Sequence, residues 1–584
     1  LALGLAALFF SSAGAFFLVL CRLPGVSLCS GGGFATLLVY HVDFAVLVWF
    51  LAMAGVYLSS TGPAGRLEWP ALLLAWIGAF ALLLAPAQGP APPILANYFP
   101  VLANPLFLGG MAAMGLGALL LVVNRLLQGA DALGVVVAAL AMLCALVVFV
   151  LTGAPLVGSP QTPEAMEKLF WAGGHLLQHA HVLLLASLWL WLQGRENPEF
   201  TSPGWLQWLF MLALLPSLAG IFLTGAPPEE YTRLMRWTSW WVVPGVAWVL
   251  ARQWRASGLG EPFGWLSLLL LLLGLGMGVV VREQTLLVPA HYHGAVGAVT
   301  LGYMGLTRRL FVEWQVAAPG SRLDRWQPLL FAAGVVLLVV GLAVAGFSGL
   351  PRKTPGMDHP WEGAAALGMV LAAIGGLISA ASSLWFVVRA VPLWWRVQHK
   401  GNLGLFAMTA LGIAAIAAVL EGWPTATPPP AVVPPPRQTE LERRFQQGVI
   451  MLHAKQYEHA LTSFHWVLKQ APKMAEAHVN LGFALLGLNR VKAAEDFFRG
   501  AIELRPFQAN AYYGLAQTLE VRGELREALG AMRTFIHLTR SDDPFLPRAR
   551  AALWEWESRL KGAPQQTPQG PPRETPADKP HGSG

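Results

Sequence analysis

The 584 residues of the chain are 55% hydrophobic and only 12% charged, and the formal net charge is +7. A soluble globular protein carries about twice that share of charged residues, so this composition excludes an entirely soluble chain. It predicts a large membrane domain with a smaller polar one. The modest positive charge is concentrated in loops and in the C-terminal region, which is typical of membrane topology and does not favour nucleic-acid binding.

Thirteen segments are apolar enough to cross a bilayer, since a spanning helix needs roughly 20 apolar residues. We expect an all-α, polytopic membrane helix bundle of about 12–13 transmembrane helices over residues 1–422. The distribution of Lys and Arg places the N-terminus in the cytoplasm, so an odd number of spans leaves the chain beyond the last one outside. The segments lie at about 1–20, 34–59, 69–87, 105–127, 132–153, 169–193, 204–224, 237–254, 263–281, 286–306, 327–349, 362–389 and 402–421.

The N-terminal segment lacks a basic leading region, and we interpret it as the first transmembrane helix rather than as a signal peptide. The three cysteines are Cys21, Cys29 and Cys144. The sequence has no C-x-x-C-H motif, so we expect no covalently attached c-type haem in this chain. These features predict a multi-pass protein of the bacterial cytoplasmic (inner) membrane.

The polar part of the chain divides into three segments. Residues 423–438 are rich in proline and should form a stiff, extended linker. Residues 439–561 are predicted to form a small α-solenoid domain on the outer (periplasmic) side. Residues 562–584 are rich in Pro, Gln and Gly and are predicted to be disordered.

A repeat of 34 residues runs through the predicted solenoid, because Ala460, Ala494 and Ala528 follow one another at that spacing. This period, over patterns typical of paired helices, resembles that of tetratricopeptide repeats. Small alanine side chains let paired helices approach closely, and about three repeats suffice to bury a shared core. Stacked helix pairs form concave surfaces, so we expect a protein partner on this domain.

Six of the 14 histidines fall within predicted spans. Ionisable residues in hydrocarbon are costly and tend to mark function. In the predicted orientation the second, sixth and tenth spans all run from outside to inside, and each carries its histidines in its first third. A structural hydrogen-bonding role would explain one such residue, but six that share a depth favour a functional layer near the outer surface. The six are His41, His175, His179, His181, His291 and His293.

The spacing of the last two histidines separates their directions. Residues i and i+2 of a helix point about 200° apart, so His291 and His293 face nearly opposite sides and can serve two metal centres. Neutral imidazole is a good axial ligand for haem iron. A haem held by two histidines is six-coordinate and suited to electron transfer, whereas a haem with one histidine keeps an open position for a small ligand.

The segment VPAHYHGAVGAVTLGYMG (288–305) resembles the tenth helix of haem-copper oxidase subunit I. That resemblance implies two haems, with His291 on a high-spin haem and His293 on a low-spin one. The segment YHVDFAVLVWFLA (40–52) is similar to the second helix of the family. It implies that His41 is the second ligand of the low-spin, bis-histidine haem.

Two shorter matches follow the same order along the chain. WAGGH (171–175) matches the W-x-x-G-H pattern of the sixth helix, whose histidine is a copper ligand in the family, which implies that role for His175. SGLPRK (348–353) resembles the outer loop in which a basic pair binds haem propionates. The resemblance assigns that role to Arg352 and Lys353.

The sequence departs from the family at the non-haem metal. The seventh helix should supply two adjacent histidines to copper, and residues 219–235 contain none, so an ordinary copper site is not expected. Because positions 175, 178 and 179 share one helix face, His175, Gln178 and His179 form the candidate catalytic group. They either bind a non-haem copper or iron weakly or only hydrogen-bond a water or substrate. His181 lies on another face, and we interpret it as structural.

Three functional hypotheses remain open. The first is a haem-copper oxidase-like subunit that reduces oxygen or nitric oxide, with electrons from a c-type cytochrome or another subunit of a respiratory complex. The second is a b-type-haem electron-transfer subunit without terminal catalysis, which the missing histidines favour and His291 disfavours. The third, a haem-free scaffold or transporter, is disfavoured by the shared depth of the histidines.

Overall fold

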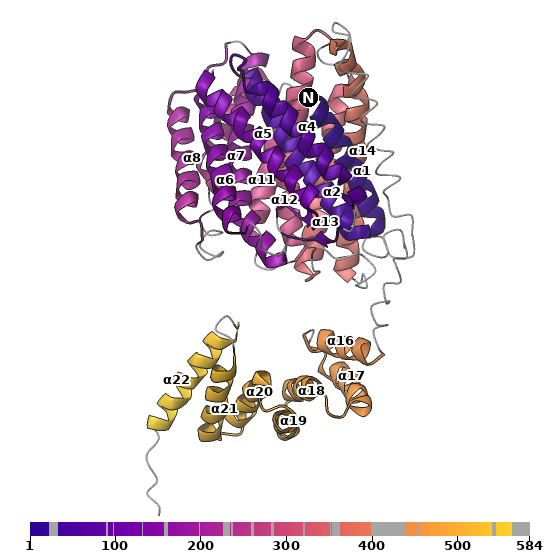
Figure 1. The fold of residues 1–584 in the computed structure, drawn as a ribbon, viewed down its shortest axis with the longest axis vertical. Helices are drawn as coiled ribbons and strands as arrows, with labels where there is room; N and C mark the ends of the chain where they lie inside the picture. Colours follow the sequence, from indigo (N-terminus) through magenta and orange to yellow (C-terminus); the bar gives the residue numbers. More distant parts are fainter. Residues whose placement is uncertain are drawn as a thin grey trace, which may run out of the picture. The chain divides into compact units, whose positions relative to one another are not determined.

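A computed structural model shows the arrangement of the chain (Figure 1). It separates into two compact units, residues Leu1–Thr425 and Ala426–Gly584, which are described here one at a time. The residues that the structure describes are 1–22, 33–88, 91–96, 98–130, 132–156, 162–197, 199–225, 234, 238–258, 262–281, 285–318, 322–350, 352, 363–398, 440–453, 455–539, 543 and 545–562.

The first unit is a bundle of long helices with one two-stranded hairpin. Its elements are α1 (Ala2–Cys21), α2 (Gly33–Val42), the π-helix η1 (Asp43–Val48), α3 (Trp49–Ser60), α4 (Glu68–Leu84), η2 (Ala85–Gln88), β1 (Pro93–Ile94), β2 (Val101–Leu102), α5 (Pro105–Gln128), α6 (Leu133–Gly153), η3 (Ala154–Leu156), α7 (Pro163–Glu196), α8 (Trp205–Phe222), η4 (Ser239–Trp241), α10 (Val243–Ser257), α11 (Pro262–Val280), α12 (Leu287–Glu313), α13 (Arg322–Phe347) and α14 (Gly363–Gln398).

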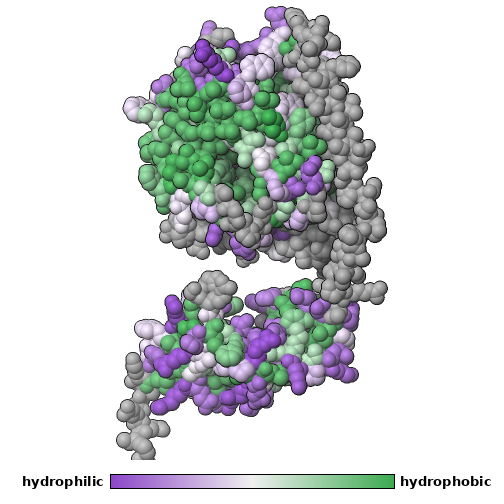
Figure 2. Space-filling view, viewed as in Figure 1, coloured by the Kyte–Doolittle hydropathy of each residue, from purple (hydrophilic) through white to green (hydrophobic). Residues whose placement is uncertain are grey.

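Ten helices among the described residues are long and apolar enough to cross a membrane. In the space-filling view, a broad hydrophobic belt covers the visible side of this unit between hydrophilic ends (Figure 2). Large apolar side chains of the helices lie exposed, among them Leu73 at 61%, Val388 at 64% and Phe222 at 87%. Such a belt is unfavourable in water and is what lipid chains cover, so this unit is a membrane domain.

Three of the thirteen predicted spans are not among these ten. Residues 237–254 include α10, which has 15 residues and is too short to cross alone. Residues 286–306 correspond to α12, whose 27 residues are long enough but include arginines and the two histidines. Residues 402–421 lie outside the described part of the chain.

Close helix packing in this unit depends on glycine. On α13, a Cβ atom at Gly341 would lie 2.3 Å from the backbone nitrogen of Ala372 on α14. A Cβ atom at Gly375 would lie 2.3 Å from the backbone nitrogen of Leu338. These glycines let the two backbones touch, which is the small-residue packing found between membrane helices.

The second unit consists of helix pairs with their own buried core, and the all-α prediction is confirmed for both units. Three alanines at the predicted 34-residue spacing, Ala460, Ala494 and Ala528, are fully buried where paired helices meet. The helices are α16 (Glu440–His453), α17 (Tyr457–Gln470), α18 (Ala475–Gly487), α19 (Val491–Leu504), α20 (Ala509–Val521), α21 (Leu525–Leu538) and α22 (Leu546–Gly562).

The turns inside the three helix pairs repeat one backbone conformation. Lys455, Asn489 and Gly523 follow the first helix of each pair, again 34 residues apart, and have φ angles of 59°, 59° and 80°. Helices commonly end in this left-handed conformation, which glycine adopts without cost and other residues adopt with strain. The three positions therefore mark the same structural site in each repeat.

Candidate functional site

The six membrane histidines lie on three helical segments. His41 is in the last turn of α2, directly before the π-helix η1. His175, His179 and His181 lie along α7, and His291 and His293 lie in the first turns of α12. Their hydrogen bonds decide which ring nitrogen of each imidazole carries the proton, because a carbonyl oxygen only accepts a hydrogen bond.

His41 is held by the neighbouring helix α1. Its Nδ1 donates to the backbone oxygen of Ser11 at 2.9 Å, and the Ser11 hydroxyl donates to the His41 carbonyl at 3.2 Å. The helices approach closely at this level, since a Cβ atom at Gly14 would lie 3.4 Å from the His41 Cβ. The proton is therefore on Nδ1, and the lone pair for a metal is on Nε2.

His291 is held in the same way by α11. Its Nδ1 donates to the carbonyl oxygen of Gly274 at 2.7 Å. Two glycines make this contact possible: a Cβ at Gly274 would lie 2.5 Å from the Ala295 nitrogen, and a Cβ at Gly278 would lie 2.8 Å from the His291 Nδ1. The bond fixes both the ring direction and the tautomer, which is what metal-binding histidines require of their surroundings.

Three other histidines use a carbonyl of their own helix. The Nδ1 atoms of His175, His181 and His293 donate to the carbonyl four residues earlier, at 2.8, 2.8 and 2.7 Å. The same local bond occurs in the repeat domain at His465 and His478, at 3.3 and 3.0 Å. A local bond alone therefore does not indicate a metal ligand, and the bonds between helices at His41 and His291 carry more weight.

The histidines form two pairs. The imidazoles of His41 and His293, from α2 and α12, lie within electrostatic reach of each other. Those of His175 and His291, from α7 and α12, do the same. His291 and His293 thus interact electrostatically with histidines of different helices.

His179 behaves differently from the others. Its Nε2 donates to the carbonyl oxygen of Ala213 on α8 at 2.8 Å, and its buried Nδ1 has no hydrogen-bond partner. The bond directs the ring of His179 toward the backbone of α8, while Gln178, a partly buried neighbour, has no described bond to it. Within the described residues, no three or more His, Cys, Asp or Glu side chains gather in a metal-binding group. A metal shared by His175 and His179 remains a prediction.

Basic residues gather near the first pair. Arg352, from the loop after α13, and Arg22, at the end of α1, both interact electrostatically with Tyr292. The Tyr292 ring stacks on His293 at a centroid distance of 4.8 Å, and Arg22 also acts on His293. Burial lowers the pKa of both guanidinium groups from its ordinary value, and the nearby Tyr292 opposes that shift.

Two of these residues were not predicted. The sequence predicted no role for Arg22 or for Tyr292, which lies between His291 and His293. Two signals could have identified them: Tyr292 lies between two candidate ligands, and Arg22 lies at the end of a predicted span. Lys353, the other predicted propionate ligand, lies outside the described residues.

A further buried polar group lies two residues after His41 in the chain. Asp43 begins the π-helix and is fully buried, and neither of its carboxylate oxygens has a hydrogen-bond partner in the described structure. π-Helical turns are rare and occur frequently at functional sites. This local widening of the second span was not predictable from hydropathy.

In the repeat domain, one buried carboxylate joins two repeats. The Glu495 side chain is 3% exposed and pairs with Arg499 at 2.8 Å, with Lys492 at 3.5 Å and with Arg522 of the next helix pair. Burial alone would raise the pKa of Glu495, but the hydrogen bonds from the arginines outweigh it and lower the pKa. The ion pairs thus stabilise the stacking of the second repeat on the third.

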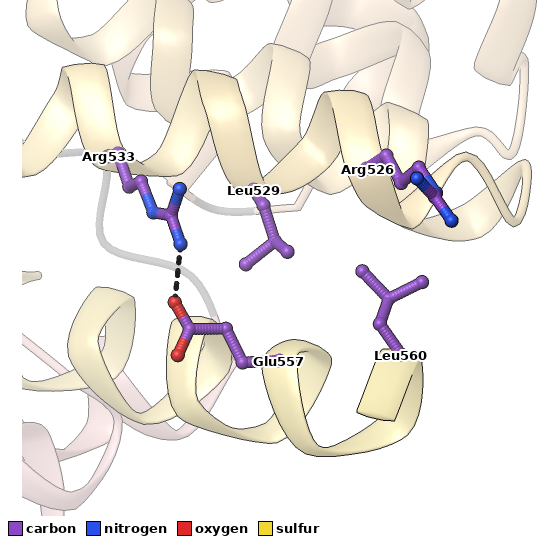
Figure 3. Close-up of a pocket in the computed structure, with 5 residues that line it drawn as sticks. All are labelled: Arg526, Leu529, Arg533, Glu557 and Leu560. Carbon is purple, nitrogen blue, oxygen red and sulfur yellow. Dashed lines mark hydrogen bonds and ion pairs between the residues drawn. The ribbon is translucent and has the colours of Figure 1, made fainter. Parts of the chain in front are cut away.

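A pocket of about 410 Å³ opens between α21 and the final helix α22 (Figure 3). Arg533 on α21 reaches across it to Glu557 on α22 at 2.6 Å, while Arg526 projects at the other end. Leu529 and Leu560 complete the lining. The lining thus combines charged and apolar groups.

Comparison with known proteins identifies the repeat. The tetratricopeptide repeat family matches residues 452–509, which confirms the prediction drawn from the 34-residue period. Repeats of this kind bind other proteins. An uncharacterised protein of Aquifex aeolicus (strain VF5) is 27% identical over 310 residues, 50% of this chain and 78% of that protein. An uncharacterised protein of Rickettsia prowazekii (strain Madrid E) is 22% identical over 456 residues, 61% of this chain and 86% of that protein.

Proposed function

We propose that the membrane unit binds two haems and, as a haem-copper oxidase-like subunit, reduces a small gas molecule, oxygen or nitric oxide. The electrons would come from a c-type cytochrome or from another subunit of a respiratory complex. The observation that carries this proposal is the pairing of His41 with His293 and of His175 with His291.

The residues fit a haem at the first pair. His41 and His293 come from different helices, and each carries its proton on Nδ1, so the Nε2 lone pairs are available to iron. Arg352 and Arg22 both interact with Tyr292, which stacks on His293, and these cations would bind the two carboxylates of a haem. Lys353 would add a third cation.

The second pair differs in a way that suits catalysis. His291 would hold the other haem, and His175 would face its open side instead of providing a sixth ligand. A haem iron in that position supplies one-electron reduction and a coordination position for a small gas. The protein's part is to fix His291 through Gly274, to hold His175 opposite it and to exclude water with the surrounding apolar helices.

A second candidate function is electron transfer without terminal catalysis, by a b-type-haem subunit of a larger complex. It is favoured by the absence of histidines from residues 219–235. At His179 the Nε2 is engaged by Ala213, which leaves only Nδ1 for a metal. A non-haem copper or iron at His175 and Gln178 would argue against it. Metal analysis of the purified protein distinguishes the two, because a stoichiometric non-haem metal supports catalysis.

The proposal includes an outer location for this layer and for the repeat domain, as the predicted orientation of the spans has it. Cys21, at the end of α1 that adjoins the layer, takes part in a disulfide bond. Disulfides persist on the oxidising side of a bacterial cytoplasmic membrane. An electron-donating cytochrome would meet the outer histidine layer on that side, and the tetratricopeptide repeats would provide its docking surface or bind another respiratory subunit.

An optical difference spectrum, reduced minus oxidised, tests the proposal directly. We expect low-spin haem bands that disappear in His41→Ala and His293→Ala. Carbon monoxide binding to the reduced protein should disappear in His291→Ala while those bands remain. His181→Ala is the control, because His181 is a buried membrane histidine that makes the same local bond as His293 but belongs to neither pair. Absence of haem bands from the wild-type protein would refute both candidate functions.

A further inference from the structure

A loop outside the membrane helices contributes a side chain to the predicted gas site. The segment between α4 and α5 forms the hairpin β1–β2, in which Pro93 pairs with Leu102 and Ile94 with Val101. Tyr98 lies in the turn of this hairpin. Its ring contacts the imidazole of His175 at a centroid distance of 4.7 Å.

Two aromatic rings, those of Tyr98 and Trp171, contact the His175 imidazole and each other. Trp171, one turn earlier on α7, has its ring 4.9 Å from the imidazole and 6.1 Å from the ring of Tyr98. The carbonyl of Trp171 also accepts the Nδ1 hydrogen bond of His175. The indole Nε1 of Trp171 is buried and has no partner in the described structure, although buried donors are almost always paired. An acceptor is therefore expected beside these rings.

The backbone at Tyr98 is strained to place the ring there. Its φ angle is 66°, in the left-handed region that non-glycine residues adopt at a cost of about 1–2 kcal/mol. Such strain persists only where the surroundings impose it, and it concentrates at functional sites. Room for the ring comes from Gly174, where a Cβ atom would lie 2.5 Å from the Tyr98 Cγ.

The hairpin is anchored firmly enough to hold this conformation. Phe99, the next residue, is 3% exposed and packs on Phe170 at 5.5 Å, while Val101 and Leu102 are fully buried. Asn104 accepts hydrogen bonds from the first amides of α5 and donates to the carbonyl of Ala85 at 3.2 Å. Tyr98 is thus held in place from both sides of the turn.

We propose that Tyr98 is a positioning residue of the gas site. Its ring holds the His175 imidazole against Trp171. Its phenol lies within electrostatic reach of Arg352. This assignment rests on the proposed function, in which His175 faces the open side of the haem on His291. It predicts that removing the Tyr98 ring frees His175 and changes how a small ligand is held.

Carbon monoxide dissociation from the reduced full-length protein measures this effect. We expect Tyr98→Ala to change the dissociation rate about tenfold, the change that loss of one aromatic pair contact produces. Tyr98→Phe, which keeps the ring, should restore the wild-type rate to within about twofold. Phe99→Leu is the matched control, because it disturbs the same hairpin without touching His175, and it should leave the rate unchanged. An unchanged rate in Tyr98→Ala, or an equal change in Phe99→Leu, would overturn the proposal.

A second measurement does not depend on haem. In protein labelled with ¹³C at the histidine Cε1, the resonance of His175 is identified by its loss in His175→Asn. Loss of the Tyr98 ring current should shift this resonance in Tyr98→Ala and not in Phe99→Leu. If the wild-type protein contains no haem but Tyr98→Ala shifts the resonance, the proposed function is refuted and the contact between Tyr98 and His175 is supported. A haem-containing protein without the shift refutes the positioning role alone.

Discussion

Gly278 tests whether the site geometry is needed for haem binding. A Cβ atom at this position would lie 2.8 Å from the His291 Nδ1 and 2.9 Å from its Cε1. Ordinary van der Waals contact begins at 3.4 Å, so the Gly278→Ala imidazole must move by 3.4 − 2.8 = 0.6 Å. That movement disrupts the 2.7 Å hydrogen bond to Gly274. The loss corresponds to about 0.5–1.5 kcal/mol for the bond, and changes to such supporting groups weaken metal binding by about 10–100-fold.

The assay is carbon monoxide titration of the reduced protein, with the low-spin haem bands as the internal reference. Gly276→Ala is the control, because Gly276 lies on the same helix with nothing within 4 Å of its added Cβ. Exchanging glycine for alanine within a helix is otherwise stabilising by about 0.5–1 kcal/mol. We expect Gly278→Ala to weaken carbon monoxide binding and Gly276→Ala to leave it intact. Equal affinities in the two variants would show that the His291–Gly274 contact does not position a haem ligand.

Three further predictions concern the stability of the two units. Glu495→Gln should destabilise the repeat region by about 1–3 kcal/mol in urea unfolding of residues 439–562, because a buried charge-assisted contact is lost. Since the folded pKa of Glu495 is lowered, its contribution is full above the ordinary pKa of 4.5 and is lost as the pH falls further; a wild-type midpoint that stays constant on acidification would contradict this. Lys455→Gly should raise the unfolding midpoint by relieving a left-handed backbone worth about 1 kcal/mol, and a lower midpoint would argue against strain there. Gly341→Val should lower the detergent thermal midpoint of the full chain, since its Cβ meets the backbone of α14; an unaltered midpoint would exclude close α13–α14 contact.

Most of the fold follows from local sequence patterns. Hydropathy identified the ten described spanning helices, because the ability to cross a bilayer depends on about 20 consecutive apolar residues within one segment. The 34-residue spacing identified the repeats in the same way, since each unit packs only on its neighbours. Among the described elements, α10 was predicted to start too early, because the tryptophan-rich residues before it were counted as part of one apolar segment.

The site was predictable only in part. Histidines on separate segments could be placed at one depth, but which pairs meet depends on helix rotation and contact. The direction of His179 is set by the approach of α8, a neighbour that no sequence pattern specifies. Tyr98 was missed because a lone tyrosine in a loop carries no motif, and only the folded hairpin brings it to His175.

The acceptors that orient His41 and His291 are peptide oxygens, which every residue possesses. No substitution at Ser11 or Gly274 deletes such an oxygen; a substitution only alters how near the two helices come. The tautomer and the ring direction of these imidazoles are therefore set when the helices of the bundle pack together. A cofactor would meet oriented ligands once α1 has packed on α2 and α11 on α12. Before these helices pack, the imidazoles of His41 and His291 would not be oriented for binding.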